Sequence, residues 1–460
     1  MADTTVAILM LVMKFGGSSV RDGAWIDRVL DIAEGRLREA PLLVSSAMGK
    51  TTDQLVAVAE TASDGNAPAA FARVEKLRKA HIASCGALLS GEARDRATGL
   101  VEKLFGEMTS LVQGVSLIKE CTPRTYDALL AFGELLSTTI IAERANERGI
   151  DTVLLDSRNL LVTDENFTAA TPDLQASAER IRESVVPAPG RLYIAQGFIA
   201  STPAGVTSTL GRGGSDFTAT IFGAALQAER VEIWTDVDGI MSCDPRVVPE
   251  ARSITRLSYD EASELAYFGA RVVHPSTILP AMELSIPVQV RNTGNPEHPG
   301  TTITAETEAR GFQALAGKNG ITVITVHSSR MLNAYGFLSR LFKVFEEERV
   351  SVDLVATSEV SVSVTVDQER LPSGLEERLR SFGRLTVEHD KGILCLVGRD
   401  LWKDSAFLAR VFTSIGHDIP VRLISLGSSD INLSLVIPAE RSEEAMRRLH
   451  GEFFSLREAG

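Results

Sequence analysis

The sequence lacks paired cysteines, long apolar runs and a surplus of basic residues. Its four cysteines lie far apart and form no Cys-X-X-Cys pair, which argues against a disulfide framework and against a zinc site. No apolar stretch is long enough to span a membrane. Lys and Arg number 47 against 60 Asp and Glu, a formal charge of −13, which argues against nucleic acid or an anionic membrane as a partner. We expect a cytoplasmic protein with free thiols.

The first part of the chain alternates apolar strands with amphipathic helices. Strands are predicted at Pro41–Ser45, Thr152–Asp156, Leu192–Phe198 and Val231–Thr235, and helices include Tyr126–Arg148 and Asp216–Ala228. This alternation predicts an α/β fold with a mainly parallel sheet covered by helices on both faces. The segment Asn292–Gly300, with two prolines and two glycines, is predicted to be a linker.

The last third contains an internal repeat. Phe337–Phe342 is echoed by Phe407–Phe412 at an offset of 70 residues, and each copy follows one strand and precedes a pair of strands. Two strand-helix-strand-strand units are therefore predicted, with sheets that pair within the chain or across a dimer. A loop between the first strand and the helix could then line a ligand pocket. The alternative is that the repeat only dimerises the protein.

Two glycine-rich turns, Lys14–Ser19 and Gly211–Asp216, lie about two hundred residues apart. Glycine lets backbone N–H groups approach an anion closely, and Lys14 and Arg212 add positive charge. The turns therefore predict a site for a polyphosphate and a second anion. Asp216 would orient a lysine or bind Mg²⁺ through water. The alternatives are a lysine that reaches solvent and a helix that Ser215 or Asp216 merely caps.

Further candidates are spread along the same part of the chain. Gly49–Thr52 resembles the end of a Walker A loop, but Val44 stands where that loop needs glycine, so its threonines either bind a ligand or cap a helix. Glu134 lies in an otherwise apolar helix and is either solvated or placed to hold a substrate ammonium. Thr235 and Asp236 are candidates for ribose or base contacts and Arg246 for a phosphate contact, with a simple Asx turn as the alternative.

An ordered set of motifs resembles the aspartokinases, amino-acid kinases that phosphorylate the β-carboxylate of L-aspartate. The set comprises Lys14–Ser19, Gly133-Glu134, Gln196–Phe198, Gly211–Asp216, Trp234–Val237, Asp244–Arg246 and Phe268–Pro275. The repeat resembles the tandem ACT regulatory units of this family. In detail the chain is most similar to the lysine-sensitive monofunctional type, through Met331-Leu332, Gly336–Leu338, Ser351–Leu354 and Thr357–Val362.

The resemblance implies an amino-acid-kinase catalytic domain at residues 1–300 and two ferredoxin-like ACT units at 301–390 and 391–460, which are allowed to exchange strands. It implies that Lys14, Arg212 and Asp216 are catalytic, and that Thr52, Glu134, Arg212 and Ser215 bind aspartate, with Thr51 a weaker candidate than Thr52. The residues implied for nucleotide binding are Lys14, Gly16, Gly17, Ser18, Thr235, Asp236, Arg246 and Arg271. No protein metal-ligand cluster is implied.

The implied cofactors are ATP and Mg²⁺, the implied effector is L-lysine, and the implied assembly is a homodimer or a dimer of dimers through the ACT units. Effector contacts are implied for Met331, Phe337, Leu338, Val352, Asp353, Ser358 and Glu359. The alternatives are another amino-acid kinase of the same fold and a catalytically silent amino-acid sensor.

Three positions depart from the family pattern. Arg271 replaces a lysine of the nucleotide site, which keeps the charge but changes the geometry. Met241 replaces a tyrosine near the nucleotide. Ala334 replaces a serine of the effector loop and so removes one hydroxyl, which puts the strength and identity of the effector in question.

Overall fold

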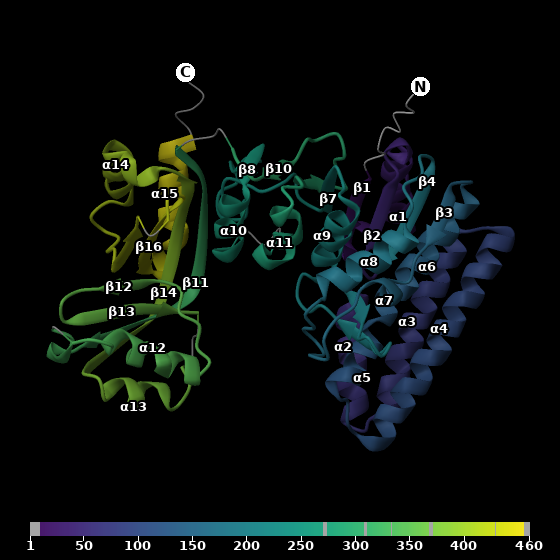
Figure 1. Ribbon diagram of the computed structural model, residues 1–460, viewed down its shortest axis with the longest axis horizontal. Helices are drawn as coiled ribbons and strands as arrows, with labels where there is room; N and C mark the ends of the chain where they lie inside the picture. The colour runs from purple at the N-terminus through teal and green to yellow at the C-terminus, as the bar shows by residue number, and fades with distance from the viewer. Residues whose placement is uncertain are drawn as a thin grey trace. The chain divides into compact units, whose positions relative to one another are not determined.

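The computed structural model describes residues 10–269, 274–307, 311–332, 334–367, 371–427 and 429–454. By its internal contacts the chain divides into two compact units (Figure 1). Unit 1 comprises Met1–Ile240 and Val272–Glu306, and unit 2 comprises Met241–Arg271 and Thr307–Gly460. The segment 241–271, which the predicted boundary at residue 300 assigned to the catalytic domain, is thus grouped with the C-terminal part of the chain.

Unit 1 is built on a mainly parallel sheet with the strand order β3-β4-β2-β1-β7-β9-β10. The strands are β1 (Leu11–Phe15), β2 (Pro41–Ser45), β3 (Asp151–Leu154), β4 (Arg191–Gln196), β7 (Arg230–Thr235), β9 (Val288–Asn292) and β10 (Thr301–Thr304). Only β10 pairs antiparallel, with β9, among these strands. Asn292–Gly300 connects β9 to β10 inside unit 1, so the prediction that it links two domains was wrong. A separate hairpin joins β5 (Ile199–Ser201) to β6 (Thr207–Thr209).

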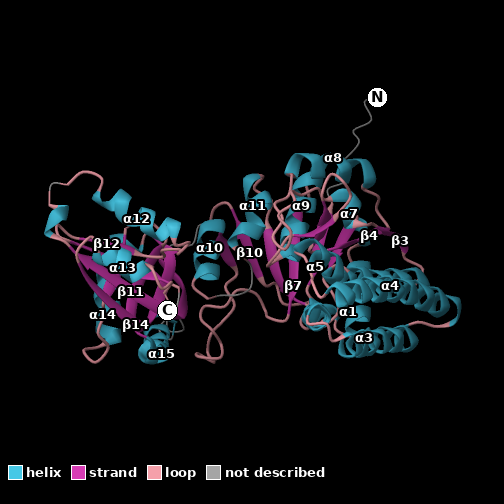
Figure 2. Cartoon of the chain, turned by 90° about the horizontal axis from the view of Figure 1, so that it is seen from below, coloured by secondary structure: helices cyan, strands magenta, loops and turns pink. Residues whose placement is uncertain are grey.

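The helices of unit 1 pack on this sheet and on one another. They are α1 (Gly23–Glu34), α2 (Thr51–Ser63), α3 (Ala67–Leu88), α4 (Gly91–Ile118), α5 (Pro123–Leu130), α6 (Phe132–Glu147), α7 (Ser157–Leu160), α8 (Leu174–Ser184), α9 (Gly214–Leu226) and α11 (Pro275–Glu283), with 3₁₀ turns at Gly17–Val20 and Leu37–Glu39. Figure 2 shows α3 and α4 as long neighbouring helices. Among the described residues, no helix is both long and apolar enough to cross a membrane.

The predicted helix Tyr126–Arg148 is interrupted at Ala131, between α5 and α6. Asp127 in α5 accepts hydrogen bonds from Thr168 and Thr209. Gly133 at the start of α6 lies so close to Ala47 that an added Cβ would stand 2.8 Å from the Ala47 side chain. The interruption lets each helix make its own contacts, which the apolar pattern of the sequence does not reveal.

The alternation of side chains along β1 decides which residue faces which layer. Leu11, Met13 and Phe15 are buried in a cluster with side chains of α1 to α6. Because successive strand residues point to opposite faces, Val12 and Lys14 face the other side of the sheet, where α9 packs on β1. The pattern therefore places a lysine beside the start of α9.

Unit 2 contains one antiparallel sheet with the order β12-β13-β11-β14-β16-β15. Its elements are β8 (Arg256–Ser258), α10 (Tyr259–Tyr267), β11 (Gly311–His327), α12 (Phe337–Glu347), β12 (Val355–Thr357), β13 (Ser361–Val366), α13 (Leu375–Arg380), β14 (Arg384–Arg399), α14 (Ser405–Ile415), β15 (Leu423–Leu426), β16 (Asn432–Pro438) and α15 (Ser442–Phe454), with 3₁₀ turns at Ser329–Met331, Leu401–Lys403 and Ala439–Arg441.

The two repeats share their central strands. The first half of β11, Gly311–Asn319, pairs with Gly392–Arg399 of β14, beside β16, whereas the second half pairs with the start of β14, beside β13. Residues 311–319 therefore precede the first repeat in sequence but belong to the sheet of the second. This is an exchange of strands of the kind that the predicted boundaries allow for.

Candidate functional site

A cleft of about 360 Å³ lies in unit 1 at the carboxyl ends of β1, β2 and β4. In parallel α/β sheets this edge is where ligands usually bind. The lining comes from the turns after these strands, from α6 and from the start of α9. It consists of Lys14, Gly17, Ser46, Ala47, Gly49, Thr52, Asp53, Glu134, Phe198, Gly211, Gly213, Gly214, Ser215 and Asp216.

A lysine–aspartate ion pair lies in the cleft. Lys14 Nζ lies 2.6 Å from Asp216 Oδ1, and both side chains are 13% exposed. Lys14 comes from β1 and Asp216 from the first turn of α9. Asp216 was predicted either to orient a lysine or to bind Mg²⁺ through water. The ion pair favours the first role, in which Asp216 orients Lys14. The ammonium is held where it can also meet an anionic ligand.

The first glycine turn packs directly on the turn that follows β2. Gly49 N–H donates to Gly17 O at 3.0 Å, and Ser46 N–H donates to Phe15 O at 3.0 Å. A Cβ on Gly17 would lie 2.8 Å from Gly49 O and 2.9 Å from Ala47 O. Glycine is therefore required at position 17 because two backbone turns meet there.

Glu134 is a buried carboxyl at the wall of the cleft, only 3% exposed. Its Oε1 accepts a hydrogen bond from Ala47 N–H at 3.1 Å, while Oε2 is buried without a hydrogen-bond partner among the described residues. Burial raises the pKa of Glu134 to about 8. An unpaired buried carboxyl oxygen beside a cleft is a site for a cationic group. The alternative of a solvated helix residue is excluded by its burial.

Four cleft residues were not predicted, namely Ser46, Ala47, Asp53 and Phe198. Ser46 Oγ donates to Ser215 Oγ at 2.9 Å and so joins the turn after β2 to the start of α9. Phe198 lines the cleft from the segment after β4. Ser46 directly follows the buried strand β2, just as the first glycine turn directly follows β1. Its place at a strand end could have identified it from the sequence. Phe198 could have been found only through the Gln196–Phe198 motif.

The two adjacent threonines of α2 differ in role. Thr51 is buried, and its hydroxyl donates to Met48 O at 2.6 Å, which is a local contact at the helix start. Thr52 lines the cleft. The structure therefore places Thr52, rather than Thr51, within reach of a ligand.

The second glycine turn begins α9. Gly213 has φ of 74°, a left-handed conformation that favours glycine, and it precedes Ser215 and Asp216 in the first turn of the helix. No side chain forms a capping hydrogen bond at this end of α9. The alternative that Ser215 or Asp216 merely caps the helix is therefore wrong. Arg212 lies between two lining residues, is exposed, and forms no ion pair with any described residue.

Only some of the residues predicted for nucleotide binding lie near the cleft. Gly16 lies beside Lys14, since an added Cβ would be 3.5 Å from its Nζ. Thr235 is the last residue of β7, the strand next to β1, and Asp236 follows it and is exposed. Arg246 belongs to unit 2, where it pairs with Asp244 at 2.6 Å.

Arg271 and Ser18 were also predicted to bind the nucleotide. Arg271 lies outside the described residues. Ser18 follows Gly17 and is not among the described residues that line the cleft; its carbonyl accepts a hydrogen bond from Arg21 at 3.3 Å. Within the part of the chain that the structure describes, no group of three or more His, Cys, Asp or Glu side chains could hold a metal ion.

Unit 2 has a second pocket of about 510 Å³ in the first repeat, at the loop between β11 and α12. It is lined by five of the predicted effector residues, Met331, Phe337, Leu338, Ser358 and Glu359, together with Ala334, Tyr335, Gly336, Ser339 and Thr357. The other two predicted residues are not among its described lining. Val352 packs against the apolar core of the repeat, and Asp353 accepts a hydrogen bond from the hydroxyl of Tyr267.

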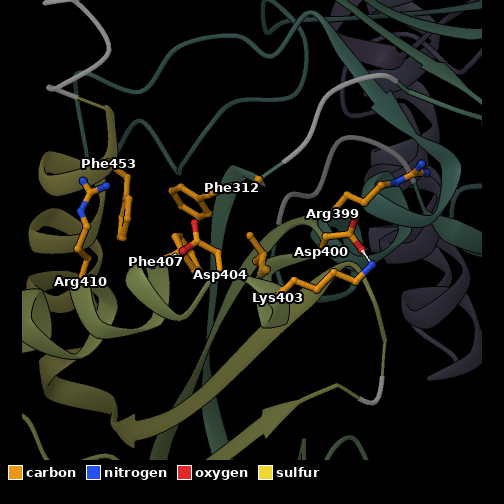
Figure 3. A pocket seen from close by; sticks show the side chains of 10 residues that line it. Phe312, Arg399, Asp400, Lys403, Asp404, Phe407, Arg410 and Phe453 are labelled. Atoms are coloured by element: carbon orange, nitrogen blue, oxygen red, sulfur yellow. Dashed lines mark hydrogen bonds and ion pairs between the residues drawn. The ribbon is translucent and has the colours of Figure 1, made fainter.

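The second repeat has a cavity of about 510 Å³ near the start of α14 (Figure 3). Phe312, Phe407 and Phe453 pack together at its base and are buried. Two ion pairs lie at its rim, Lys403 with Asp400 at 2.8 Å and Arg410 with Glu452 at 2.8 Å. This cavity lies at the loop between β14 and α14, the position that corresponds to the first pocket in the repeat, and the three phenylalanines close its base.

Two family models match the chain. The amino acid kinase family matches residues 10–292, and the ACT domain matches residues 324–377 and 394–453. The chain is 36% identical over 458 residues to lysine-sensitive aspartokinase 3 of Escherichia coli, covering 97% of this chain and 99% of that protein. It is also 36% identical over 470 residues to the chloroplastic aspartokinase 2 of Arabidopsis thaliana, covering 97% and 84%.

Solved structures give the same result. The crystal structure of E. coli aspartokinase III with aspartate and ADP, in the R-state, has a TM-score of 0.82 at 36% identity and covers 97% of this chain and 100% of that one. The same enzyme with lysine and aspartate, in the T-state, has a TM-score of 0.78 and covers 97% and 99%. The chain therefore belongs to the aspartokinase family, whose members are kinases with a carboxyl group as the phosphoryl acceptor.

Proposed function

We propose that this chain transfers the γ-phosphate of ATP to the β-carboxylate of L-aspartate, giving 4-phospho-L-aspartate. This is the first step of lysine, threonine and methionine synthesis. The observation that carries the proposal is that one cleft contains both a cationic and an acidic group. Lys14, which forms an ion pair with Asp216, lines the same cleft as Glu134, a buried carboxyl with one oxygen that has no hydrogen-bond partner among the described residues. One end of the cleft suits an anion and the other a cation, which fits ATP and an amino acid.

Aspartate is bound through both of its charged main-chain groups. Glu134 holds the ammonium, because a buried carboxyl with a free oxygen gains most from a cationic partner. Arg212, exposed between Gly211 and Gly213, is free to turn toward the α-carboxylate. Thr52 contacts the same substrate, and Ser215, fixed by Ser46, orders the wall opposite.

Phosphoryl transfer needs no general base here. The attacking β-carboxylate has a reference pKa of about 3.9 and is ionised at neutral pH. The barrier lies in bringing that anion to a second anion, so the chain must supply positive charge and alignment. Lys14 supplies the charge, Asp216 holds it in position, and the turn of Gly16, Gly17 and Ser18 offers backbone N–H groups to the phosphates.

The nucleotide lies beyond the first glycine turn, toward Thr235 at the end of β7 and Asp236 directly after it. The resemblance to the family also assigns Arg246 and Arg271 to the nucleotide. Mg²⁺ prefers oxygen ligands and is bound mostly by phosphates in kinases. The exposed carboxylate of Asp236 is an oxygen donor of the right kind. When bound, the metal neutralises charge on the transferring phosphate.

L-lysine inhibits the reaction from the pocket of the first repeat. The pocket has an apolar part in Met331, Phe337 and Leu338 and a carboxylate in Glu359, which suits an amino acid with a long side chain and a terminal ammonium. Aspartokinase III of E. coli, similar over nearly its whole length, has been solved with lysine bound. The assembly is a homodimer or a dimer of dimers through the ACT units, and the protein acts in the cytoplasm.

The deciding experiment is release of ADP from MgATP with L-aspartate, with L-glutamate and acetylglutamate as alternative acceptors, and with and without millimolar L-lysine. We expect turnover that depends on aspartate and is suppressed by lysine. Turnover with another acceptor only would replace the substrate assignment. Lysine binding without any turnover would instead indicate a sensor.

A further inference from the structure

Asp127 on α5 is a fully buried carboxyl of unit 1 that forms no ion pair with any described residue. Its oxygens accept three hydrogen bonds instead. Oδ2 accepts from the backbone N–H groups of Thr168 at 2.9 Å and Thr209 at 2.8 Å, and Oδ1 accepts from the Thr209 hydroxyl at 2.8 Å. Because a buried carboxyl is costly without such partners, the three bonds fix Thr168 and Thr209 in place.

Both segments that Asp127 holds lead to the second glycine turn. Thr209 is the last residue of β6 and stands two residues before Gly211, and Ala170 N–H donates to Thr209 O at 2.9 Å. A Cβ on Gly211 would lie only 3.1 Å from Thr168 O. The start of the turn therefore rests on backbone that Asp127 holds.

Thr168 has a backbone conformation that costs free energy. Its φ is 75°, in the left-handed region, which is rare for a β-branched residue. Such a conformation persists only where surrounding contacts determine it, and conformations of this kind cluster at functional sites. The hydrogen bond from Thr168 N–H to Asp127 is one of these contacts, and it lies beside a turn whose Gly211 lines the cleft.

The same carboxyl connects this turn to the helices that carry Glu134. Asp127 lies on α5 and Glu134 on α6, which are consecutive helices interrupted at Ala131. Glu134 and Gly211 both line the cleft, and Arg212 follows Gly211 directly. Asp127 therefore joins the segment that carries Arg212 to the pair of helices that carries Glu134.

We propose that Asp127 is a positioning residue for aspartate binding, which sets the separation between Arg212 and Glu134. The inference rests on the proposed function, in which Glu134 holds the substrate ammonium and Arg212 its α-carboxylate. Both groups are attached to one carbon of aspartate, so the two side chains must be held at a matching distance. A small displacement of the Arg212 turn lowers the affinity for aspartate, whereas ATP, which meets the first glycine turn, is little affected.

The test is Asp127→Ala in the full chain, with KM measured for aspartate and for MgATP. We expect KM for aspartate to rise about tenfold and KM for ATP to change by less than about twofold, since only the aspartate contacts are displaced. Asp127→Asn should bring KM for aspartate back to within about threefold of the parent value, because its amide oxygen can accept both backbone N–H groups. Equal rises in both KM values, or no rise in either, would overturn the positioning role.

Thr209 offers a milder change, which decides the question if Asp127→Ala does not fold. Thr209→Val removes the hydroxyl that donates to Oδ1 and keeps the shape of the side chain, so KM for aspartate should rise about threefold. The matched control is Thr207→Val on the same strand, where the half-buried hydroxyl has no hydrogen-bond partner among the described residues. The control should leave both KM values unchanged, and an equal rise in the two valine variants would count against Asp127.

A double variant shows whether the effect passes through Arg212. In an Arg212→Ala background, Asp127→Ala should change KM for aspartate by less than about twofold, because the side chain that it positions is already gone. A further rise of about tenfold in the double variant would show that Asp127 does not act through Arg212. A parent enzyme without aspartate-dependent turnover would overturn the proposed function itself, whereas normal turnover with an unchanged KM in Asp127→Ala would overturn only the positioning role.

Discussion

The cleft of unit 1 and the effector pocket of unit 2 differ in how far their groups are enclosed. In the cleft, Glu134 is 3% exposed and the paired Lys14 and Asp216 are 13% exposed. In the pocket, Tyr335 is 98% exposed and Leu338 is 41% exposed. Electrostatic contacts act most strongly where water is excluded. Lys14, Asp216 and Glu134 are therefore arranged before a ligand binds, whereas Tyr335 and Leu338 must be ordered as a ligand binds, which reduces the effect of each of their contacts.

The largest effect is expected for Lys14→Ala. Loss of the one cation that Asp216 holds in the cleft should lower kcat about 1,000-fold, since removal of a preorganised charge-stabilising group costs about 10²–10³ in rate. Lys76→Ala, an exposed lysine on α3, is the control and should leave kcat unchanged. Steady-state ADP release measures both, and circular dichroism checks the fold. Near-parental turnover in Lys14→Ala would remove the lysine from the mechanism.

Glu134→Gln should raise KM for aspartate about 30-fold with a smaller change in kcat, because a charged hydrogen bond to the substrate ammonium is lost. The pKa of about 8 adds a second readout. At pH 7 the empty cleft holds a protonated carboxyl, and an ammonium favours the ionised form. Aspartate binding should therefore release a proton at pH 7, which calorimetry in buffers of different ionisation enthalpy detects.

The same residue makes stability depend on pH. Its folded pKa lies above the ordinary value of 4.5, so its contribution to stability is complete below pH 4.5 and is lost as pH rises to about 8. Glu134→Gln should remove this part of the melting-temperature profile and abolish the proton release. Equal proton release in the variant would show that another group titrates.

The close packing of the cleft can be tested at Gly133. Gly133→Ala places a Cβ 2.8 Å from Ala47, and overpacking of this kind should lower the free energy of unfolding by about 1–3 kcal/mol. Gly106→Ala, in the middle of α4 with open space around it, should raise it by about 0.5–1 kcal/mol. Urea unfolding measures the pair. A higher free energy of unfolding in both variants would mean that helix propensity alone decides.

The smallest effect is expected in the open pocket. Ala334→Ser adds a hydroxyl to its lining and should lower the half-inhibitory lysine concentration about threefold, the size of one neutral hydrogen bond. Ala406→Ser, an exposed site on α14 of the second repeat, is the matched control and should change nothing. Inhibition that weakens in Ala334→Ser would show that the serine crowds the effector instead of binding it.

Much of unit 1 could be predicted because its strands are continuous apolar runs. Pro41–Ser45 and Val231–Thr235 match β2 and β7 to within one residue. Lys14 was recognisable because a lysine at the end of a buried strand needs a partner. The interruption at Ala131 and the return of Asn292–Gly300 into β10 were missed, since both depend on contacts with segments far away in the sequence.

The sequence by itself determined the chemistry: a fixed cation, glycines that admit backbone, an acid in an apolar helix and a repeated regulatory unit. Only the tertiary structure decided which of these groups are paired. It placed Asp216 on Lys14, left one oxygen of Glu134 free and gave Asp353 to Tyr267 instead of the pocket. The physical reason is that ion pairing and burial depend on how helices and strands pack against one another, whereas a sequence pattern indicates only the face of a helix or strand on which each residue lies.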